Sequence, residues 1–277
     1  MNRKVWATPF IVWMVLFTLA PIVLVVIYSL TDASGAFTLD NFAAFLDPIY
    51  INVLLRSIGM ALLCTLICLL IAYPAAYFLS QKDIDKKGVL ILLFIIPMWM
   101  NFLLRTYAWL TLLESNGLIT SAVNRVLSWF GVQQEVRLLY NYGAVLMGMV
   151  YNYLPFMILP IYSVIIKLDP SLLEAARDLG AHTFNVFRRV ILPLSLPGVL
   201  SGITMVFVPS VSTFAISKML GGGTELLLGD LIEQQFLGGA YNPYLGAAIS
   251  LVMMIIVVIC MAVMNRFGEG EEQAVMM

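Results

Sequence analysis

Six stretches of about 20 predominantly apolar residues are the feature that most constrains how this chain can fold. They cover residues 7–30, 57–79, 89–113, 143–166, 196–217 and 245–264. A helix of roughly 20 apolar residues crosses the hydrocarbon core of a bilayer and satisfies its own backbone hydrogen bonds there. The sequence therefore predicts an all-α polytopic membrane protein with six transmembrane helices.

The overall composition agrees with a chain that is embedded in lipid. Of the 277 residues, 61% are hydrophobic and 11% are charged, whereas roughly 25% of an ordinary soluble domain is charged. The 15 Lys and Arg residues and the 16 Asp and Glu residues leave a net charge of −1. A chain this close to neutral does not attract the phosphate backbone of nucleic acid. The lipid bilayer is the expected environment, and no nucleic-acid partner is expected.

The reactive side chains do not form a catalytic or metal-binding set. Cys64, Cys68 and Cys260 lie in apolar runs without a neighbouring His or carboxylate, so we interpret them as packing residues rather than metal ligands. All carboxylates and His182 fall outside the six spans, which argues against a proton-coupled carrier. The sequence has no Gly-x-x-x-x-Gly-Lys-Ser/Thr loop, so another polypeptide must bind ATP if ATP drives transport. We expect a chain that is not an enzyme.

The positions of Lys and Arg predict the orientation in the membrane. Ten of them lie at the two termini or in segments 80–88 and 167–195, and four lie in segments 31–56, 114–142 and 218–244. Because the side with more Lys and Arg faces the cytoplasm, both termini are predicted to be inside. Arg105 lies within the third span. We expect it to pair with Glu114 or with a carboxylate of a partner.

Prolines and glycines mark special places in the spans. Prolines interrupt four of the spans, at Pro74, Pro97, Pro155, Pro160 and Pro209. Each removes a backbone hydrogen bond that lipid cannot replace. Two interpretations remain: the helices are kinked within a packed bundle, or the freed backbone faces a translocation cavity. Gly198 and Gly202 predict that the fifth span packs closely against another helix.

The cytoplasmic segment 167–195 has strong signals for two short helices. Asp169 is a good N-cap, and Pro170 suits the first helical position. Ala175 and Ala176 leave one side of this helix nearly flat, and Gly180 can end it in a left-handed turn.

A second short helix should follow in the same segment. Thr183 can cap it, Phe184 and Phe187 lie on it, and Pro193 is expected to end it. Two short helices around a glycine would make a rigid projection on the cytoplasmic face. Such a projection can transmit motion between a membrane bundle and a soluble motor.

This segment resembles the EAA loop of permeases of ATP-binding-cassette (ABC) importers, and we call residues 167–195 the coupling loop. The resemblance rests on the spacing of Glu174, Ala175, Ala176, Gly180, Val190, Leu192 and Pro193, with Val190 where Ile is usual. It implies a type I ABC importer permease fold in which these residues contact the ATPase. A stand-alone channel would have no need of such a loop.

Residues 37–265 also resemble the spermidine/putrescine branch of that family, and within it the PotB-type subunit. The similar stretches include residues 37–42, 46–50, 97–107, 151–157 and 220–223. The resemblance implies a first transmembrane helix and outer loop at 1–52, a transmembrane core at 53–265 and a cytoplasmic tail at 266–277. Related permeases share some of these stretches, so a permease for another solute, such as iron, sulfate or thiamine, remains the alternative.

The family resemblance also implies a set of partners in a bacterial cell membrane. These are a PotC-like second permease, a homodimeric PotA-like ATPase that binds ATP and Mg, and an extracytoplasmic PotD-like polyamine-binding protein. This chain would form half of the translocation pathway and would need no cofactor of its own.

A polyamine pathway needs weak hydrogen-bond acceptors and aromatic faces, because ammonium groups bind aromatic rings by cation–π contact. The candidates are Trp99, Asn101, Tyr107, Tyr151, Asn152 and Tyr153. Packing within the core or at the membrane interface is the alternative for each of them.

One concentrated group of carboxylates lies on the predicted outer side. Thr224 can cap a helix over residues 225–236, on which Glu225, Gly229 and Glu233 would share a face with Asp230 beside it. We hypothesise that Glu225, Asp230 and Glu233 line an outer gate or contact the binding protein. A merely solvated face is the alternative.

Overall fold

The computed structural model describes residues 3–81, 87–131, 136–239 and 241–275, and helices dominate these ranges. The helices are α1 (Arg3–Met14), η1 (Val15–Leu19), α2 (Ala20–Ser29), α3 (Asp40–Phe45), α4 (Pro48–Ser80), α5 (Lys87–Trp99), α6 (Phe102–Leu113), α7 (Leu118–Trp129), α8 (Tyr142–Ile165), α9 (Pro170–Asp178), α10 (Thr183–Val186), η2 (Phe187–Ile191), α11 (Leu192–Val211), α12 (Ala215–Gly221), α13 (Leu228–Leu237) and α14 (Pro243–Val275). An isolated bridge between Thr31 and Phe37 is the β-type pairing within these ranges.

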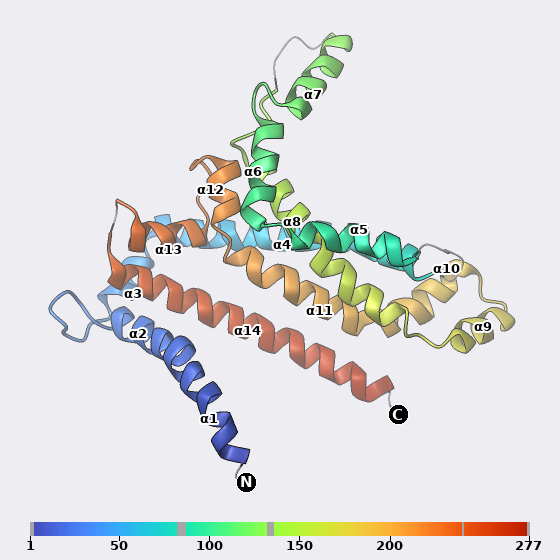
Figure 1. Cartoon of the computed structure of the whole chain (residues 1–277), viewed down its shortest axis with the longest axis horizontal. Coiled ribbons are helices and arrows are strands. Elements are labelled where there is room, and N and C mark those ends of the chain that lie inside the picture. Colours follow the sequence, from blue (N-terminus) through green and yellow to red (C-terminus); the bar gives the residue numbers. More distant parts are fainter. Residues whose placement is uncertain (1–2, 82–86, 132–135, 240, 276–277) are drawn as a thin grey trace.

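The long helices α4, α8 and α11 form the centre of the molecule (Figure 1). A Cβ atom on Gly198 would lie 2.9 Å from the carbonyl oxygen of Pro160, and one on Gly202 would lie 2.7 Å from the sulfur of Met157. These two glycines therefore let α11 approach α8 closely, which confirms the predicted helix packing. Cys64 and Cys68 are buried in the same core, as expected of packing residues.

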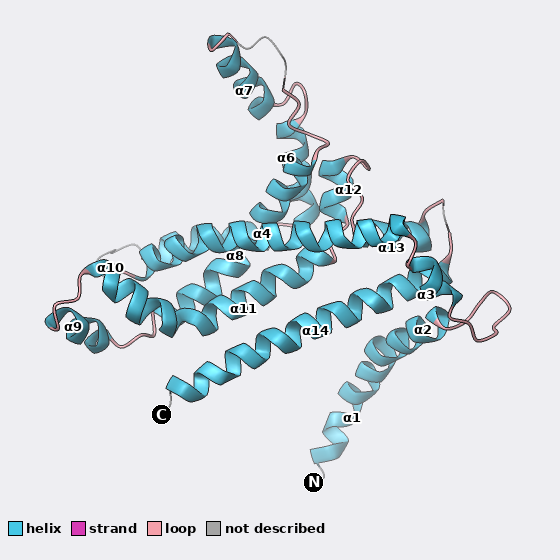
Figure 2. Ribbon diagram, turned by 180° about the vertical axis from the view of Figure 1, so that it is seen from behind, coloured by secondary structure: helices cyan, strands magenta, loops and turns pink. Residues whose placement is uncertain are grey.

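Five helical segments are long and apolar enough to cross a membrane: Pro9–Ser29, Pro48–Ser80, Tyr142–Ile165, Thr183–Val211 and Pro243–Met264. They overlap five of the six predicted spans, and the chain is all-helical in the described ranges, as predicted. The α1–η1–α2 segment lies largely apart from the core, because among its described side chains from Pro9 to Ser29 only Ser29, at the end, is buried. Its α2 end packs on α14 (Figure 2). The rings of Tyr28 and Tyr244 meet there, with 5.5 Å between their centroids.

The third predicted span, residues 89–113, consists of two helices rather than one. Helix α5 ends at Trp99, and α6 begins at Phe102 and turns away from the bundle towards α7 (Figures 1 and 2). The side chain of Asn101 accepts hydrogen bonds from the amides of Leu103 and Leu104 at 2.9 and 3.3 Å. Asn101 is thus an N-cap, and an N-cap residue has non-helical backbone angles that start a new helix.

The predicted second helix of the coupling loop does not end at Pro193. The chain is helical from Thr183 to Val211, through α10, η2 and α11. The amide of Leu192 bonds to the carbonyl of Phe187, five residues back, which is the π-helical pattern. Pro193 follows directly after this π-helical turn, in the first turn of α11, and the helix continues through it. Thr183 does not cap this helix either, because the N-cap position is His182.

The last helix runs without interruption from Pro243 to Val275, across the predicted start of a cytoplasmic tail at residue 266. The predicted division at residues 52 and 265 stays a prediction. Lys82 and Lys86, which contribute to the predicted orientation, lie outside the described residues. The coupling loop and α13 lie at opposite ends of the bundle (Figure 1).

Candidate functional site: the coupling loop and the outer pocket

The first helix of the coupling loop forms as its local sequence predicts. The Asp169 side chain accepts a hydrogen bond from the amide of Ser171 at 2.9 Å, and Pro170 occupies the first turn. Gly180 has a φ of +82°. Its amide bonds to Arg177 O at 2.9 Å, and the amide of Ala181 bonds to Ala176 O at 3.1 Å. This pair of bonds is a Schellman motif, which fixes the direction in which the chain leaves α9.

The ring of Phe187 anchors the loop to the bundle. It meets Tyr73 and Tyr77 of α4 edge-on, with 5.5 Å between ring centroids in each pair. The Tyr73 hydroxyl shares a 2.7 Å hydrogen bond with Ser195 of α11. Aromatic pairs of this geometry add about 0.5–1.5 kcal/mol each beyond the burial of apolar area. The base of the coupling loop is therefore tied to two core helices.

The tip of the loop presents apolar side chains away from the bundle. Leu179 is 89% exposed, Phe184 is 68% exposed and Leu172 is 48% exposed. Apolar side chains gathered at the end of a rigid element are typical of a contact surface for another protein. Glu174 and Ala175 are exposed beside them, whereas Ala176 packs against the core.

A large cavity separates the loop from the bundle. Its volume is about 920 Å³, and Tyr77, Lys167, Glu174 and Arg177 are among its lining residues. Of the remaining motif residues, Val190 is half-buried, and Leu192 and Pro193 are exposed at the start of α11. Ile191 is the buried residue of this stretch, which the motif alone does not reveal.

The six candidate pathway residues lie on two parts of the chain, the break between α5 and α6 and the helix α8. Trp99 and Tyr107 are exposed near the break between α5 and α6, where Asn101 acts as the cap described above. Asn152 and Tyr153 are buried in α8, where Asn152 donates to Gly148 O at 2.8 Å and Tyr153 donates to Pro209 O at 3.3 Å.

Tyr151 lies near an aromatic residue that was not among the predicted candidates. Its ring meets that of Trp109 edge-on, with 5.2 Å between centroids. The two rings belong to α8 and α6, so no sequence spacing connects them.

Arg105, expected to pair with Glu114 or a partner's carboxylate, is only 7% exposed. Its Nε and Nη1 atoms are buried and have no hydrogen-bond partner among the described residues. The ion pairs of the described residues do not include Arg105 with Glu114, so that pairing is wrong, and pairing with a carboxylate of a partner stays a prediction.

The outer helix begins later than predicted. Helix α13 starts at Leu228, so Glu225 precedes it, and the Thr224 hydroxyl donates to Gly221 O at 2.6 Å instead of capping the helix. Gly229 does not share a polar face with the carboxylates. A Cβ atom there would lie 2.5 Å from the carbonyl oxygen of Thr213, so Gly229 marks a close backbone approach.

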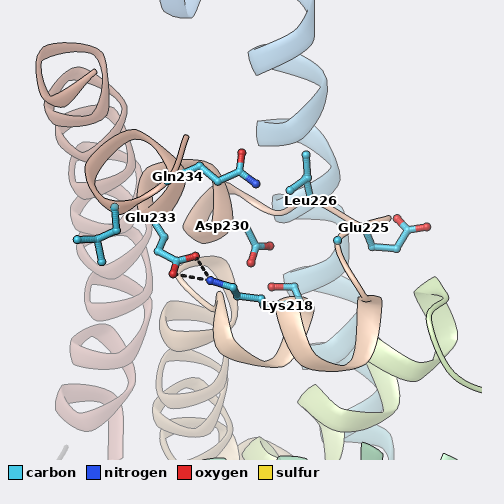
Figure 3. Close-up of a pocket in the computed structure, with 10 residues that line it drawn as sticks. Lys218, Glu225, Leu226, Asp230, Glu233 and Gln234 are labelled. Atoms are coloured by element: carbon cyan, nitrogen blue, oxygen red, sulfur yellow. Dashed lines mark hydrogen bonds and ion pairs between the residues drawn. The ribbon is translucent and has the colours of Figure 1, made fainter. Parts of the chain in front are cut away.

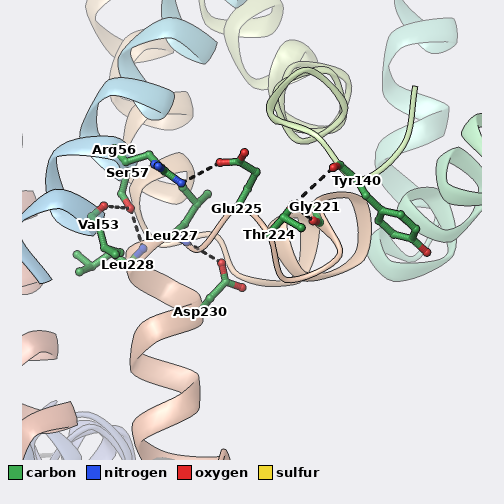
Figure 4. Close-up of polar contacts among 10 residues, drawn as sticks. All are labelled: Val53, Arg56, Ser57, Tyr140, Gly221, Thr224, Glu225, Leu227, Leu228 and Asp230. Carbon is green, nitrogen blue, oxygen red and sulfur yellow. Dashed lines mark hydrogen bonds and ion pairs between the residues drawn. The ribbon is translucent and has the colours of Figure 1, made fainter. Parts of the chain in front are cut away.

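Two side chains of α4 hold the start of this outer element in place (Figure 4). Arg56 pairs with Glu225 at 3.0 Å. The Ser57 hydroxyl accepts a 2.7 Å hydrogen bond from the amide of Leu228 and donates to Val53 O at 2.8 Å. The Leu228 amide is one of the first amides of α13, which have no partner within their own helix. Ser57 therefore acts as an N-cap supplied by another helix.

The three predicted outer carboxylates line one pocket (Figure 3). Its volume is about 180 Å³, and the labelled lining residues are Lys218, Glu225, Leu226, Asp230, Glu233 and Gln234. We call it the outer pocket. Lys218 of α12 binds both carboxylate oxygens of Glu233, at 2.6 and 2.9 Å. Lys218 was expected only as an outer-side charge, and its 15-residue separation from Glu233 gives no sequence signal of pairing.

Asp230 differs from the other two carboxylates because it is buried. It is 4% exposed, and its Oδ2 accepts a 2.9 Å hydrogen bond from the amide of Leu227. Burial raises the pKa of this carboxyl above its ordinary value, against the lowering effects of the Ser217 hydroxyl and the Leu227 amide. No group of three or more His, Cys, Asp or Glu side chains that could hold a metal ion occurs in the described parts of the chain.

Comparisons with known proteins agree with these features. Residues 4–269 match the family model described as a binding-protein-dependent transport system inner membrane component. The chain is 41% identical over 251 residues to the spermidine/putrescine transport system permease protein PotB of Escherichia coli (strain K12), covering 88% of this chain and 90% of that protein. It is 37% identical over 264 residues to PotB of Haemophilus influenzae, covering 93% and 91%.

The fold is also similar to that of solved ABC transporters. A chain of a bacterial alginate ABC transporter, in complex with an alginate pentasaccharide-bound periplasmic protein, gives a TM-score of 0.77 at 18% identity and covers 95% of this chain and 92% of that one. A chain of the MetNI methionine ABC transporter, in an inward-facing conformation, gives 0.61 at 17% identity and covers 80% and 95%. At these identities the likeness shows the fold alone.

Proposed function

This chain belongs to the family of binding-protein-dependent transport system inner membrane components, and from that premise we propose that it forms half of the pathway of an ATP-driven polyamine importer. The family is found in the bacterial inner membrane, and its members are non-catalytic, multi-pass subunits of ABC transporters. The observation that carries the substrate assignment is the 41% identity to a spermidine/putrescine permease over 88% of the chain.

In the complex that we propose, this chain pairs with a PotC-like second permease. A homodimeric PotA-like ATPase, which binds ATP and Mg, docks on the cytoplasmic face, and a PotD-like binding protein delivers the polyamine from outside. The coupling loop supports the ATPase contact, because its exposed tip carries Leu172, Leu179 and Phe184 at the end of the bundle. Glu174, Ala175, Ala176 and Gly180 form the helix and turn behind that tip.

The coupling loop transmits motion through its rigid connection to the core. When ATP binding closes the ATPase pair, the docked tip moves with it. The Schellman turn at Gly180 keeps α9 and α10 in a fixed relation, and Phe187 carries the displacement to α4. Because α10, η2 and α11 are one helical segment, movement of the tip also rotates α11. The pathway then changes from inward-facing to outward-facing, and hydrolysis resets it.

The solute side of the proposal rests on the aromatic and acidic residues. Trp99, Tyr107 and Tyr151 offer ring faces to ammonium groups, and Trp99 and Tyr107 are exposed on the protein surface. Glu225, Asp230 and Glu233 line a pocket at the outer end, where a polycation arrives. This pocket is the proposed outer gate or the contact with the binding protein.

The test is uptake by the complete importer reconstituted in liposomes with ATP inside. Labelled putrescine and spermidine should accumulate only when the ATPase and the binding protein are both present, and unlabelled polyamine should compete. Uptake of sulfate, iron or thiamine instead would assign the chain to another solute. Solute movement through the purified chain alone, without the ATPase, would contradict the importer mechanism.

A further inference from the structure

The outer pocket contains a buried carboxylate oxygen, Oδ1 of Asp230, that no described residue satisfies with a hydrogen bond. Asp230 Oδ2 is bonded to the amide of Leu227, but Oδ1 is buried and has no hydrogen-bond partner among the described residues. The hydroxyl of Ser217 lies beside this carboxylate and lowers its pKa, but it donates its proton to Phe214 O at 2.8 Å rather than to Oδ1. A buried charge without a partner is costly, and in proteins such a group normally takes up a proton or pairs with a cation.

The other two carboxylates of the pocket already have their partners. Glu225 is bound to Arg56 at 3.0 Å, and Glu233 holds the Lys218 ammonium group with both oxygens. Among the described residues, Asp230 is therefore the carboxylate of this pocket that has no ion-pair partner of its own. Figure 3 shows its carboxylate pointing into the space beside Lys218 and Glu233.

The size and donor set of the pocket select the kind of cation that fits. A volume of about 180 Å³ exceeds the roughly 10–15 Å³ that one water molecule needs by the same measure, so the pocket can hold an ammonium group with attached methylenes. A hard metal ion needs 6–8 oxygen ligands, whereas an ammonium group is bound well by one carboxylate in a short charge-assisted hydrogen bond. The carbon chain of Leu226 also lines the pocket and can pack against methylenes.

Lys218 shows how such a group can be bound and also how the pocket can be blocked. Its ammonium group lies at the edge of the pocket, with 61% of its side chain exposed, and Glu233 binds it at 2.6 Å. The positive charge of Lys218 also acts on Asp230. If Glu233 did not hold Lys218, this resident ammonium group could pair with Asp230 itself.

We propose that Asp230 binds one ammonium group of the incoming polyamine in an entry subsite at the outer end of the bundle, and that Glu233 keeps this subsite open by retaining Lys218. This inference rests on the proposed function, because it takes the transported solute to be a polyamine. It adds a ligand-binding role for Asp230. It also adds a role for the Lys218–Glu233 ion pair, which we call the guarding role: the pair keeps Lys218 away from Asp230.

Asp230→Asn in the complete reconstituted importer tests the first part. Asparagine keeps an oxygen that can accept from the Leu227 amide, so the start of α13 is preserved while the charge is lost. Loss of a charge-assisted hydrogen bond should reduce putrescine uptake at sub-saturating concentration roughly tenfold to a hundredfold, mainly through KM. The matched control is Asp40→Asn, which removes an exposed carboxylate in the first turn of α3, outside the pocket. It should import at the wild-type rate.

Glu233→Gln tests the guarding role. It frees Lys218 to occupy Asp230, so uptake should fall about as far as in Asp230→Asn. The double variant Lys218→Gln/Glu233→Gln removes the resident ammonium group as well, and uptake should return to within a fewfold of wild type.

The outcomes separate this inference from the proposed function. If the wild-type complex does not import polyamines, both are overturned. If the wild type imports but Asp230→Asn has an unchanged KM, Asp230 is only a helix cap and the binding role is overturned. If Glu233→Gln imports normally, or the double variant stays as impaired as Glu233→Gln, the guarding role is overturned. Co-purification of this chain with the second permease and the ATPase reports assembly of each complex, and a variant that fails to assemble is replaced by the double variant for the comparison of KM.

Discussion

The coupling loop is shaped mainly by its own backbone, whereas the outer loop (residues 218–244) is shaped by side chains of distant helices. At the coupling loop, a cap at Asp169 and a Schellman turn at Gly180 involve residues a few positions apart. At the outer loop, two residues of α4 make the bonds: Arg56 pairs with Glu225, just before α13, and Ser57 accepts a hydrogen bond from the amide of Leu228, the first residue of α13. Ser57 and Leu228 are 171 positions apart in the sequence.

This difference follows from what each end must do. A coupling loop has to keep its shape while it moves with a partner, so local bonds and one aromatic anchor suit it. A pocket has to keep its walls at a fixed distance, so its elements are bonded to the bundle. The exposed tip of the coupling loop is therefore suited to contact another protein, and the buried carboxylate of the outer pocket is suited to bind a ligand.

The largest effect is expected from Gly180→Val. The left-handed φ of +82° costs a β-branched residue roughly 1–2 kcal/mol or forces the turn to change. Either result alters the direction of α10, so ATP hydrolysis should continue while polyamine uptake is lost. Glu174→Lys, which reverses a charge on α9, should uncouple ATP hydrolysis from uptake in the same way. For each variant the measurement is the ratio of solute imported to ATP hydrolysed.

Gly131→Val is the matched control for the turn. Gly131 has a φ of +81°, and like Gly180 it has no atom within 4 Å of an added Cβ. It follows α7, away from the coupling loop, so the same backbone strain should leave the coupling ratio unchanged. Equal losses in both variants would mean that strain alone, rather than the position of the turn, causes the defect.

The next effect separates the tip of the coupling loop from its base. Phe187→Ala removes the ring that packs on Tyr73 and Tyr77 and should lower the free energy of unfolding by up to ~3 kcal/mol. Phe184→Ala removes an exposed ring and should change stability by less than ~0.5 kcal/mol. It should instead weaken ATPase binding about tenfold. Thermal unfolding of the purified permease and titration of the ATPase measure the two, and the reverse pattern would contradict the assignment of tip and base.

A smaller effect is expected at the α4 contact with the outer loop. Ser57→Ala leaves the buried amide of Leu228 without an acceptor, at a cost of about 1–3 kcal/mol. Ser128→Ala is the control, because the Ser128 hydroxyl is exposed and bonds to Arg125 O within its own helix. The melting temperature should fall only in the first variant. An equal fall in both would mean that Ser57 is not a cap for α13.

The features that the sequence predicts correctly are those that depend on residues close together in the chain. The cap at Asp169, the turn at Gly180 and the close packing at Gly198 depend on residue type and short spacing, so they are readable from the sequence. The same is true of five spans, because their apolar length exceeds what a soluble helix needs.

The missed features depend on distant residues or on backbone register. Thr224 looks like a cap, but α13 begins at Leu228 because Ser57 of another helix satisfies its amide. Pro193 looks like a helix end, but the π-turn before it lets the helix continue. In the outer pocket, the carboxylates are visible in the sequence, but the burial of Asp230 and the Lys218–Glu233 pair follow from the fold.

The smallest expected effect is a pH dependence of stability that belongs to the outer pocket alone. Because burial raises the pKa of Asp230 in the folded state, this group stabilises the fold fully below its unfolded pKa, ordinarily about 3.9, and that contribution is lost as pH rises through the folded pKa. Glu233 also raises the pKa of Asp230, whereas the Ser217 hydroxyl, the Leu227 amide and Lys218 lower it.

Asp230→Asn, which stays neutral, should therefore melt at the same temperature as wild type near pH 4 and slightly higher than wild type at pH 7. A variant that is more stable at pH 7 but imports less would mean that the buried charge is retained for binding rather than for stability. If wild type instead gained stability relative to Asp230→Asn as the pH rose, Asp230 would have a stabilising partner within the chain. The claim that its charge is unsatisfied in the outer pocket would then be wrong.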